Sequence, residues 1–213
     1  MQLAITLPDQ LINGQDNLIL SPANIDVWRW LSAWPKWPLP QVVVTGSVGC
    51  GKTHMAQSLP GFHITIETYH QYDPMILVQN QSLLIIDDFD QFEDETWLFH
   101  LYNLIKEHDR QAVYFSHQTP AVHQFKIADL ASRLRSLPCL TIHEPDDELF
   151  RQLFKKQLYA KGIVCSEDIL EYVFRRFDRS YQTIHWLVKL INDQTLLQQR
   201  PLTVPFLKDI LGE

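Results

Sequence analysis

The chain has 213 residues, 46% of them hydrophobic and 20% charged, a composition that excludes intrinsic disorder as its main state. Asp and Glu outnumber Lys and Arg by 25 to 18, and the net charge of −7 disfavours a protein whose main task is to bind nucleic-acid phosphates. At this length we expect one large domain or two small ones.

The sequence shows no clear pattern for membrane insertion, secretion or paired cysteines. No apolar run approaches the roughly 18 to 20 residues of a membrane span, and the segment after Met1 lacks the basic and apolar regions of a signal peptide. Cys50, Cys139 and Cys165 are widely spaced and form no C-x-x-C pair. We therefore expect a cytoplasmic protein with no membrane partner, no disulfide framework and no cysteine zinc site.

The first 40 residues contain two patterns. Apolar residues alternate with others over residues 2–7, which is compatible with an extended peptide at a free end and equally with a β-strand. Further on, four tryptophans lie among three prolines, and we interpret this group as aromatic packing that leads into the first core strand. The tryptophans are Trp28, Trp30, Trp34 and Trp37.

The chain contains only 7 glycines, yet three of them lie within residues 46–51. Residues 46–53 match the P-loop pattern G-x-x-x-x-G-K-[ST], after the β-branched run 42–45 and before a helical stretch. Such a loop turns backbone N–H groups and the positive end of a helix toward phosphate. In this pattern Lys52 reaches the β and γ phosphates and the Thr53 hydroxyl binds Mg²⁺. The predicted nucleotide-binding residues are Gly46, Ser47, Val48, Gly49, Cys50, Gly51, Lys52, Thr53 and His54.

A second acidic motif lies about 35 residues beyond the P-loop. The apolar run 83–86 reads as a buried strand and ends in Asp87 and Asp88, at the sheet edge where ligands bind. We predict that Asp87 holds Mg²⁺, directly or through water, and that Asp88 polarises the attacking water.

The remaining segments alternate between strands and helices up to residue 145. Strands are predicted at 62–66, 112–116 and 139–142, and helices at 94–108 and 127–137. This alternation predicts an α/β core with a parallel five-stranded sheet over residues 13–145. From 146 to 213 only helical patterns occur, with caps expected at Ser166, Ser180 and Thr203, which predicts a small all-helical lid.

A P-loop sheet followed by a helical lid is the outline of the AAA+ ATPases. The motifs at 51–54, 86–92 and 129–134 resemble those of the DnaA-related AAA+ proteins, and the segments 21–24 and 34–38 resemble the shorter Hda type in particular. The resemblance covers essentially the whole chain. It implies a regulator of chromosomal replication initiation that binds ATP or ADP with Mg²⁺, docks on the DNA polymerase sliding clamp and stimulates hydrolysis of ATP bound to a DnaA-type initiator.

The resemblance also assigns residue roles. Arg133 falls at the arginine finger, which acts in trans on ATP held by a partner; the alternative is a helix-surface arginine paired with Asp129, and Arg135 is the neighbouring candidate. Residues 1–12 resemble a clamp-binding peptide, with Gln2, Leu3, Ile5 and Leu7 as its contacts. DnaA proteins carry a DNA-binding domain after the lid, whereas this chain ends at Glu213, so no dedicated DNA-binding domain is expected.

Two positions depart from the family pattern. His117 stands where this branch usually has an aspartate after the fourth strand, and Gln182 stands where many relatives have a nucleotide-sensing arginine. Loss of a fixed positive charge weakens the preference for a triphosphate. We therefore expect nucleotide binding, with a possible preference for ADP, and weak intrinsic ATPase activity at most.

Other functions remain open. A self-contained, ATP-driven helicase loader or remodeller of the DnaA-like class would need its own ATP cycle and contacts with single-stranded DNA. A small P-loop kinase would close an arginine-bearing lid over a phosphate acceptor. The sequence leaves undecided which nucleotide is resident, whether the chain forms a homo-oligomer and where an initiator would bind.

Overall fold

The computed structural model describes residues 18–212, so the predicted clamp-binding residues Gln2, Leu3, Ile5 and Leu7 lie outside the described residues. Among the described helices, none is long and apolar enough to cross a membrane.

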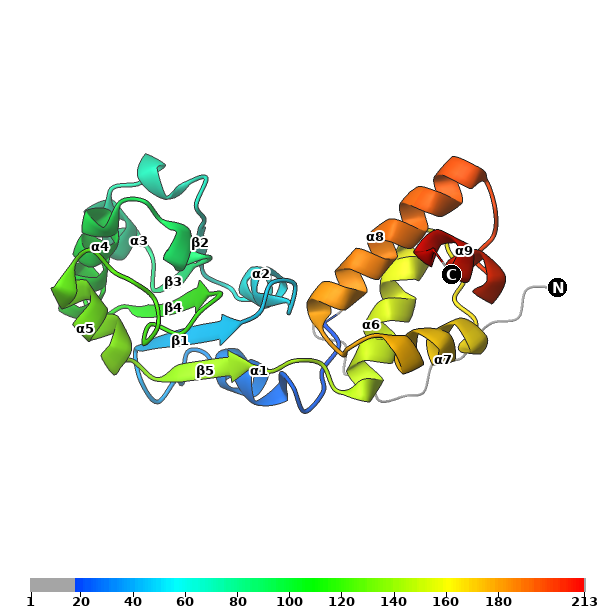
Figure 1. Ribbon diagram of the computed structural model, residues 1–213. Coiled ribbons are helices and arrows are strands. Elements are labelled where there is room, and N and C mark those ends of the chain that lie inside the picture. The colour runs from blue at the N-terminus through cyan, green and yellow to red at the C-terminus, as the bar shows by residue number, and fades with distance from the viewer. Residues whose placement is uncertain (1–17, 213) are drawn as a thin grey trace.

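The core is built on one five-stranded sheet, as predicted. Its strands are β1 (Gln41–Gly46), β2 (Phe62–Ile64), β3 (Leu83–Ile86), β4 (Gln111–Ser116) and β5 (Cys139–Ile142). They lie in the order β2-β3-β4-β1-β5, and all neighbouring pairs are parallel. Strand β4 thus separates the P-loop strand β1 from the acidic strand β3. The strands β1, β4 and β5 all point toward the lid (Figure 1).

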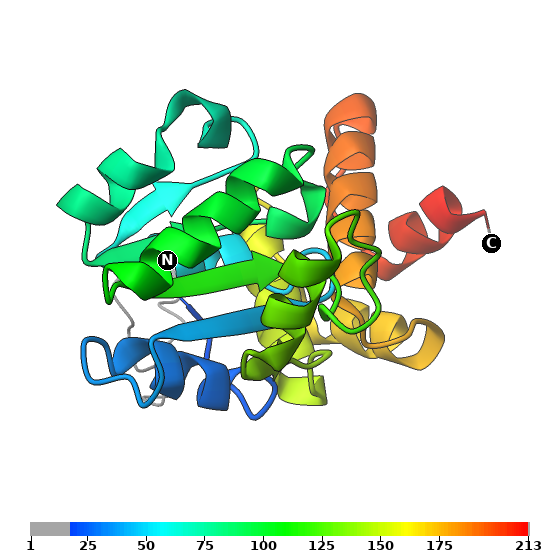
Figure 2. The ribbon, with the colours of Figure 1, turned by 90° about the vertical axis from the view of Figure 1, so that its left-hand side faces the viewer.

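Both faces of the sheet are covered by helices, which explains why its central strands are buried and mostly apolar. Along β1, Val42 and Val44 pack in one cluster with residues of α1 (Ile25–Ser32) and α2 (Lys52–Gln57), whereas Val43 packs in a second cluster on the other face. Helices α3 (Pro74–Asn80), α4 (Glu95–Glu107) and α5 (Ala128–Ser136) cover that second face. Figure 2 views the molecule from the side of α4 and α5, with the lid helices in orange and red at the far side.

Helices α1 and α3 were not predicted from the sequence. Helix α1 carries Trp28 and Trp30, and the Trp30 and Trp37 rings lie 4.6 Å apart, so the predicted aromatic packing is found and part of it is helical. Helix α3 begins at Pro74 after Asp73, whose side chain accepts hydrogen bonds from two backbone N–H groups. Two short 3-10 turns, η1 (Tyr69–Gln71) and η2 (Phe89–Gln91), complete the core.

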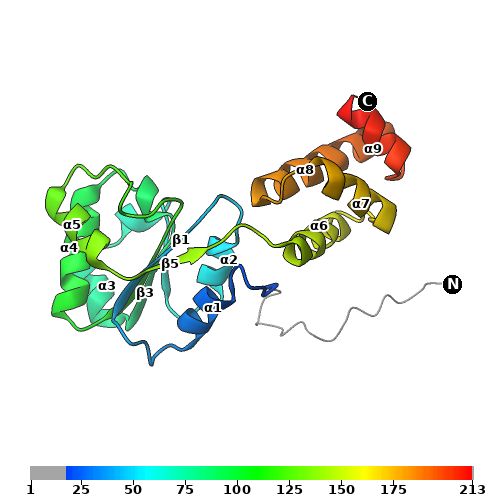
Figure 3. The ribbon, with the colours of Figure 1, turned by 60° about the horizontal axis from the view of Figure 1, so that its bottom comes forward.

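The lid consists of α6 (Asp147–Ala160), α7 (Glu167–Arg176), α8 (Tyr181–Gln198) and α9 (Val204–Leu211). These helices share a hydrophobic cluster of their own, and Figure 3 shows them grouped beyond the end of β5. The side chains of Asp146, Ser180 and Thr203 cap α6, α8 and α9. The predicted cap at Ser166 is wrong in one respect: α7 begins after it, but its side chain makes no capping hydrogen bond.

Candidate nucleotide-binding site

The P-loop is a tight turn between β1 and α2 at the edge of the sheet that faces the lid (Figure 1). Gly49 and Gly51 have φ values of +83° and +97°, a backbone conformation that side chains other than glycine rarely adopt. A Cβ atom at Gly46 would lie 2.5 Å from the Cys50 sulfur. The three glycines of the motif are therefore required by the turn itself, two by their backbone conformation and one by crowding.

Cys50 has a structural place in this loop. Its side chain is 5% exposed, and burial raises the pKa of its thiol, which keeps the group protonated. Val48, by contrast, is 55% exposed at the tip of the turn.

Lys52 is buried at the first position of α2, with 5% of its surface exposed. Its ammonium group donates hydrogen bonds to the carbonyl oxygens of Gly46, at 2.9 Å, and Ser47, at 3.2 Å. A buried ammonium group needs such partners because burial removes it from water. Phosphate oxygens in the loop would offer it stronger, charged acceptors.

Asp87 follows β3 and lies beside the P-loop, where the sheet order brings β1, β4 and β3 together. Burial raises the pKa of its carboxyl group, and the Asp88 charge adds to the effect, whereas a hydrogen bond from Thr53 and the charge of Lys52 oppose it. The two residues predicted to hold Mg²⁺, Thr53 and Asp87, are thus in contact.

Several polar atoms at this site have no hydrogen-bond partner although they are buried. They are the Oγ atom of Ser47, the Nε2 atom of His54 and the Oδ1 atom of Asp87. Buried polar atoms of native proteins are normally paired, so unpaired ones around a P-loop fit a site that accepts a phosphate and its cation. Thr53 and Asp87 have the oxygen donors that Mg²⁺ prefers.

His117 and Asp88 meet at the ends of β4 and β3. The Nε2 atom of His117 lies 3.6 Å from the Oδ1 atom of Asp88, and its Nδ1 atom lies 3.4 Å from the Oδ2 atom of Asp90. The predicted sensor position therefore contacts the predicted water-polarising carboxylate. Asp90 was not singled out from the sequence, because its role depends on the neighbouring strand.

The lid contacts the P-loop through a residue that sequence reasoning missed. The Nε2 atom of His185, on the first turns of α8, lies 3.3 Å from the Gly49 carbonyl oxygen. The predicted lid sensor Gln182 is exposed, three residues earlier on the same helix. Residues three apart lie on the same face of a helix, so His185 shares a face with Gln182. This spacing from the predicted sensor position was the signal in the sequence that could have identified His185. Tyr181, buried beside Cys50 in the core cluster, holds the start of α8 against residues 143 and 144.

Arg133 lies on α5, at the end of the core away from the lid (Figure 1). Its guanidinium group donates a hydrogen bond to Asn103 and lies 5.0 Å from the ring centre of Phe99 on α4. The Asp129 carboxylate is 4.0 Å away, so the ion pair considered as an alternative is present at the limit of contact. The Arg133 side chain remains 39% exposed. Arg135 instead donates to the carbonyl oxygens of Pro120 and His123.

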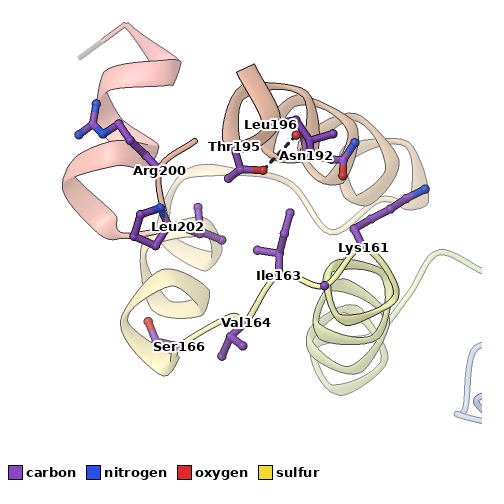
Figure 4. Close-up of a pocket in the computed structure, with 11 residues that line it drawn as sticks. Lys161, Ile163, Val164, Ser166, Asn192, Thr195, Leu196, Arg200 and Leu202 are labelled. Carbon is purple, nitrogen blue, oxygen red and sulfur yellow. Dashed lines mark hydrogen bonds between the residues drawn. The ribbon is translucent and has the colours of Figure 1, made fainter. Parts of the chain in front are cut away.

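A further cavity of about 540 Å³ lies within the lid, between the end of α6, the start of α7 and the C-terminal half of α8 (Figure 4). It is lined by apolar side chains such as Ile163 and Leu202, together with Lys161 and Arg200. Thr195, in its wall, lies ten residues or roughly 15 Å along α8 from His185. The cavity therefore contains none of the predicted site residues.

The parallel sheet, the P-loop with its acidic partner strand and the helical lid together form the predicted AAA+ fold. Residues 146–211 match the family model described as "Hda, lid domain". The fold is similar to domain III of the Thermotoga maritima replication initiation protein DnaA, with a TM-score of 0.73, 20% identity, and coverage of 92% of this chain and 94% of that one. AMPPCP-bound DnaA from Aquifex aeolicus gives a TM-score of 0.65 at 18% identity, over 83% of this chain and 63% of that one.

Two sequence relatives are similar to most of this chain. An uncharacterised protein of Haemophilus influenzae is 25% identical over 93% of this chain and 90% of its own length. The initiator DnaA of Flavobacterium psychrophilum is 24% identical over 95% of this chain, but the match spans only 47% of that initiator. The lid thus matches the Hda lid model, the fold is similar to that of DnaA domain III, and the chain spans about half the length of the DnaA relative.

Proposed function

We propose that this protein regulates replication initiation by stimulating hydrolysis of ATP held by a DnaA-type initiator, while docked on the sliding clamp of DNA polymerase. The observation that carries the proposal is the position of Arg133. Its side chain is partly exposed on α5, at the end of the core away from the chain's own lid, and this position supports action on a neighbouring molecule (Figure 1). An arginine supplied in trans stabilises negative charge on a transferring phosphoryl group.

The surroundings of Arg133 suit such a role. The Phe99 ring and the Asn103 side chain hold the guanidinium group in place, which limits the entropy lost when it engages a phosphate. Its contact with Asp129 is long, at 4.0 Å, and Asp129 is 77% exposed, so little energy opposes an exchange of this carboxylate for phosphate oxygens.

The chain's own P-loop would bind ATP or ADP as a structural ligand. Lys52 would transfer its hydrogen bonds from the carbonyl oxygens of Gly46 and Ser47 to phosphate oxygens, and Thr53 and Asp87 would hold Mg²⁺. Since His185 touches the Gly49 carbonyl, occupancy of the loop would be transmitted to α8.

Intrinsic hydrolysis is proposed to be weak. Asp88, the candidate for polarising water, lies against His117, and the lid position expected to carry an arginine is the exposed Gln182. Gln182 would supply no positive charge to the γ-phosphate, which supports a preference for ADP.

Clamp docking is proposed for residues 1–12, with Gln2, Leu3, Ile5 and Leu7 as contacts. An extended peptide can present alternate apolar side chains to a pocket and hydrogen-bond through its backbone. The residues themselves lie outside the described part of the chain, so this element rests on the sequence.

The experiment measures conversion of labelled ATP to ADP on a preloaded DnaA-type initiator, with DNA-loaded clamp present or omitted. We expect acceleration by the wild-type protein only with the clamp, and loss of acceleration when Gln2 and Leu3 are changed to Ala. Equal acceleration without the clamp would refute the docking step. No acceleration under any condition would refute the proposed function and favour a self-contained loader.

A further inference from the structure

A compact group of metal-ligating side chains lies beside the nucleotide-binding residues, at the ends of β3 and β4. Asp88 and Asp90 belong to the turn after β3, and His117 follows β4 directly. One ligand atom from each of the three residues lies within 4.8 Å of the other two. The residues proposed to hold the nucleotide's Mg²⁺, Thr53 and Asp87, are not members of this group.

The Asp90 side chain is enclosed by the protein, with only 8% of its surface exposed. Its Oδ2 atom accepts a hydrogen bond from the backbone N–H of His117 at 3.0 Å. Its Oδ1 atom is buried and has no hydrogen-bond partner, and the same holds for the Oδ1 atom of Asp88. A buried carboxylate oxygen without a partner loses its hydration and gains nothing in return, so each such atom requires an explanation.

The imidazole ring of His117 is held between the two carboxylates. Its Nδ1 atom lies 3.4 Å from Asp90 Oδ2 and 3.2 Å from the side-chain amide of Gln91, and its Nε2 atom lies 3.6 Å from Asp88 Oδ1. A ligating histidine is commonly oriented in this way, by a carboxylate at the nitrogen that does not bind the metal. With its proton on Nδ1, facing the Asp90 carboxylate, and with the Gln91 amide turned so that its oxygen faces Nδ1, the ring leaves Nε2 free to act as a ligand together with Asp88.

The spacing is suited to an ion. Two donor atoms about 2.1 Å from one tetrahedral ion lie roughly 3.4 Å apart, close to the 3.6 Å between Nε2 of His117 and Oδ1 of Asp88. This last distance is longer than a hydrogen bond, so the two groups are near each other without being bonded. The Oδ1 atom of Asp90 can turn toward the same ion, because Oδ2 already carries the contacts to His117.

We infer that Asp88, Asp90 and His117 form a second cation site, for a divalent first-row transition metal such as Zn²⁺ or Co²⁺, separate from the Mg²⁺ of the nucleotide. One imidazole and two carboxylates select such ions over Mg²⁺, which prefers oxygen ligands in octahedral geometry. Two carboxylates also offset the charge of a divalent ion. The inference depends on these three side chains and not on the action proposed for Arg133.

The test uses Co²⁺ as the probe, added to the nucleotide-free full-length protein in excess Mg²⁺ and followed by its visible absorption and by calorimetry. We expect one bound Co²⁺ per chain, and affinity at least about tenfold lower in Asp90→Asn, which keeps an acceptor for the His117 N–H. His117→Gln should lose binding, whereas His100→Gln, at an exposed histidine of α4, should retain it.

The Thr53→Val variant separates this site from the nucleotide's metal, because it removes a proposed Mg²⁺ ligand that is not a member of the group, and it should bind Co²⁺ like the wild type. Equal Co²⁺ affinity in the wild type and Asp90→Asn, or no binding by the wild type, would overturn the inference. If His117→Gln does not fold, as judged by circular dichroism, Asp90→Asn decides the question.

Discussion

The contact between His185 and Gly49 makes a quantitative prediction about how the lid is coupled to the P-loop. A Cβ atom at residue 49 would lie 2.3 Å from two atoms of the His185 ring, and the backbone there has φ +83°. Gly49→Ala therefore causes two separate penalties. The first is backbone strain, about 1 to 2 kcal/mol for a non-glycine residue in the left-handed region, and the second is displacement of the ring.

The second penalty cannot exceed the free energy that the His185 ring contributes through its contact with Gly49. The imidazole is at the end of a side chain that can rotate away, so the substitution costs the hydrogen bond to the Gly49 carbonyl rather than a fixed clash. A hydrogen bond contributes about 0.5 to 1.5 kcal/mol net. We expect Gly49→Ala to lower the free energy of unfolding by about 2 to 3 kcal/mol in the wild type, but only by the strain of about 1 to 2 kcal/mol in His185→Ala.

The assay is a double-mutant cycle in urea, with far-UV circular dichroism as the probe. The expected coupling between the two substitutions is about 1 kcal/mol, above the roughly 0.3 to 0.5 kcal/mol within which independent sites add. His185→Ala together with Ser47→Ala serves as a control pair, because the Ser47 hydroxyl has no hydrogen-bond partner to lose. Additive effects of Gly49→Ala and His185→Ala would refute a lid contact through this ring.

Three further predictions concern the site and the lid. Lys52→Ala should weaken ADP binding about 10- to 100-fold in a calorimetric titration, because a charged hydrogen bond contributes about 1.5 to 3 kcal/mol, and unchanged affinity would contradict its role. Burial raises the pKa of Asp87 in the folded state. Between the ordinary carboxyl pKa and this raised value, the folded state therefore binds more protons than the unfolded state. The free energy of unfolding should then fall as pH rises through that window. Asp87→Asn should flatten this part of the pH profile of the urea midpoint, and an unchanged slope would show that another group causes it. The Ser180 hydroxyl caps α8 by accepting a hydrogen bond from the Thr183 N–H at 3.1 Å. Ser180→Ala removes this cap and should lower the free energy of unfolding in urea by about 1 kcal/mol. A loss below the error of the measurement would show that the cap is not needed.

Local patterns were sufficient for most of the fold and for part of the site. The P-loop could be predicted because its glycines are fixed by the turn, and β3 because a fully buried strand is apolar throughout and ends in Asp87. The core helices α1 and α3 were missed because they have only 8 and 7 residues, too short for a clear helical period.

Local sequence patterns could not predict the site residues whose role depends on neighbours in the folded structure. The proposed role of Asp90 depends on His117, 27 positions away after the end of β4, and that of His185 depends on Gly49, 136 positions away in the core. Neither pair has a fixed spacing in sequence, because the sheet order and the lid position determine them. The place of Arg133 against Asn103 likewise depends on the packing of α5 on α4.

The central claim is that Arg133 acts on ATP held by another molecule. The most direct measurement is the single-turnover rate of ATP hydrolysis on a preloaded DnaA-type initiator, with DNA-loaded clamp and either wild-type protein, Arg133→Ala or Arg133→Lys. The ADP affinity of each variant is measured in the same preparations. We expect both variants to bind ADP like the wild type and Arg133→Ala to lose the acceleration, with Arg133→Lys restoring little of it because lysine lacks the bidentate fork. Full acceleration by Arg133→Ala would contradict the account.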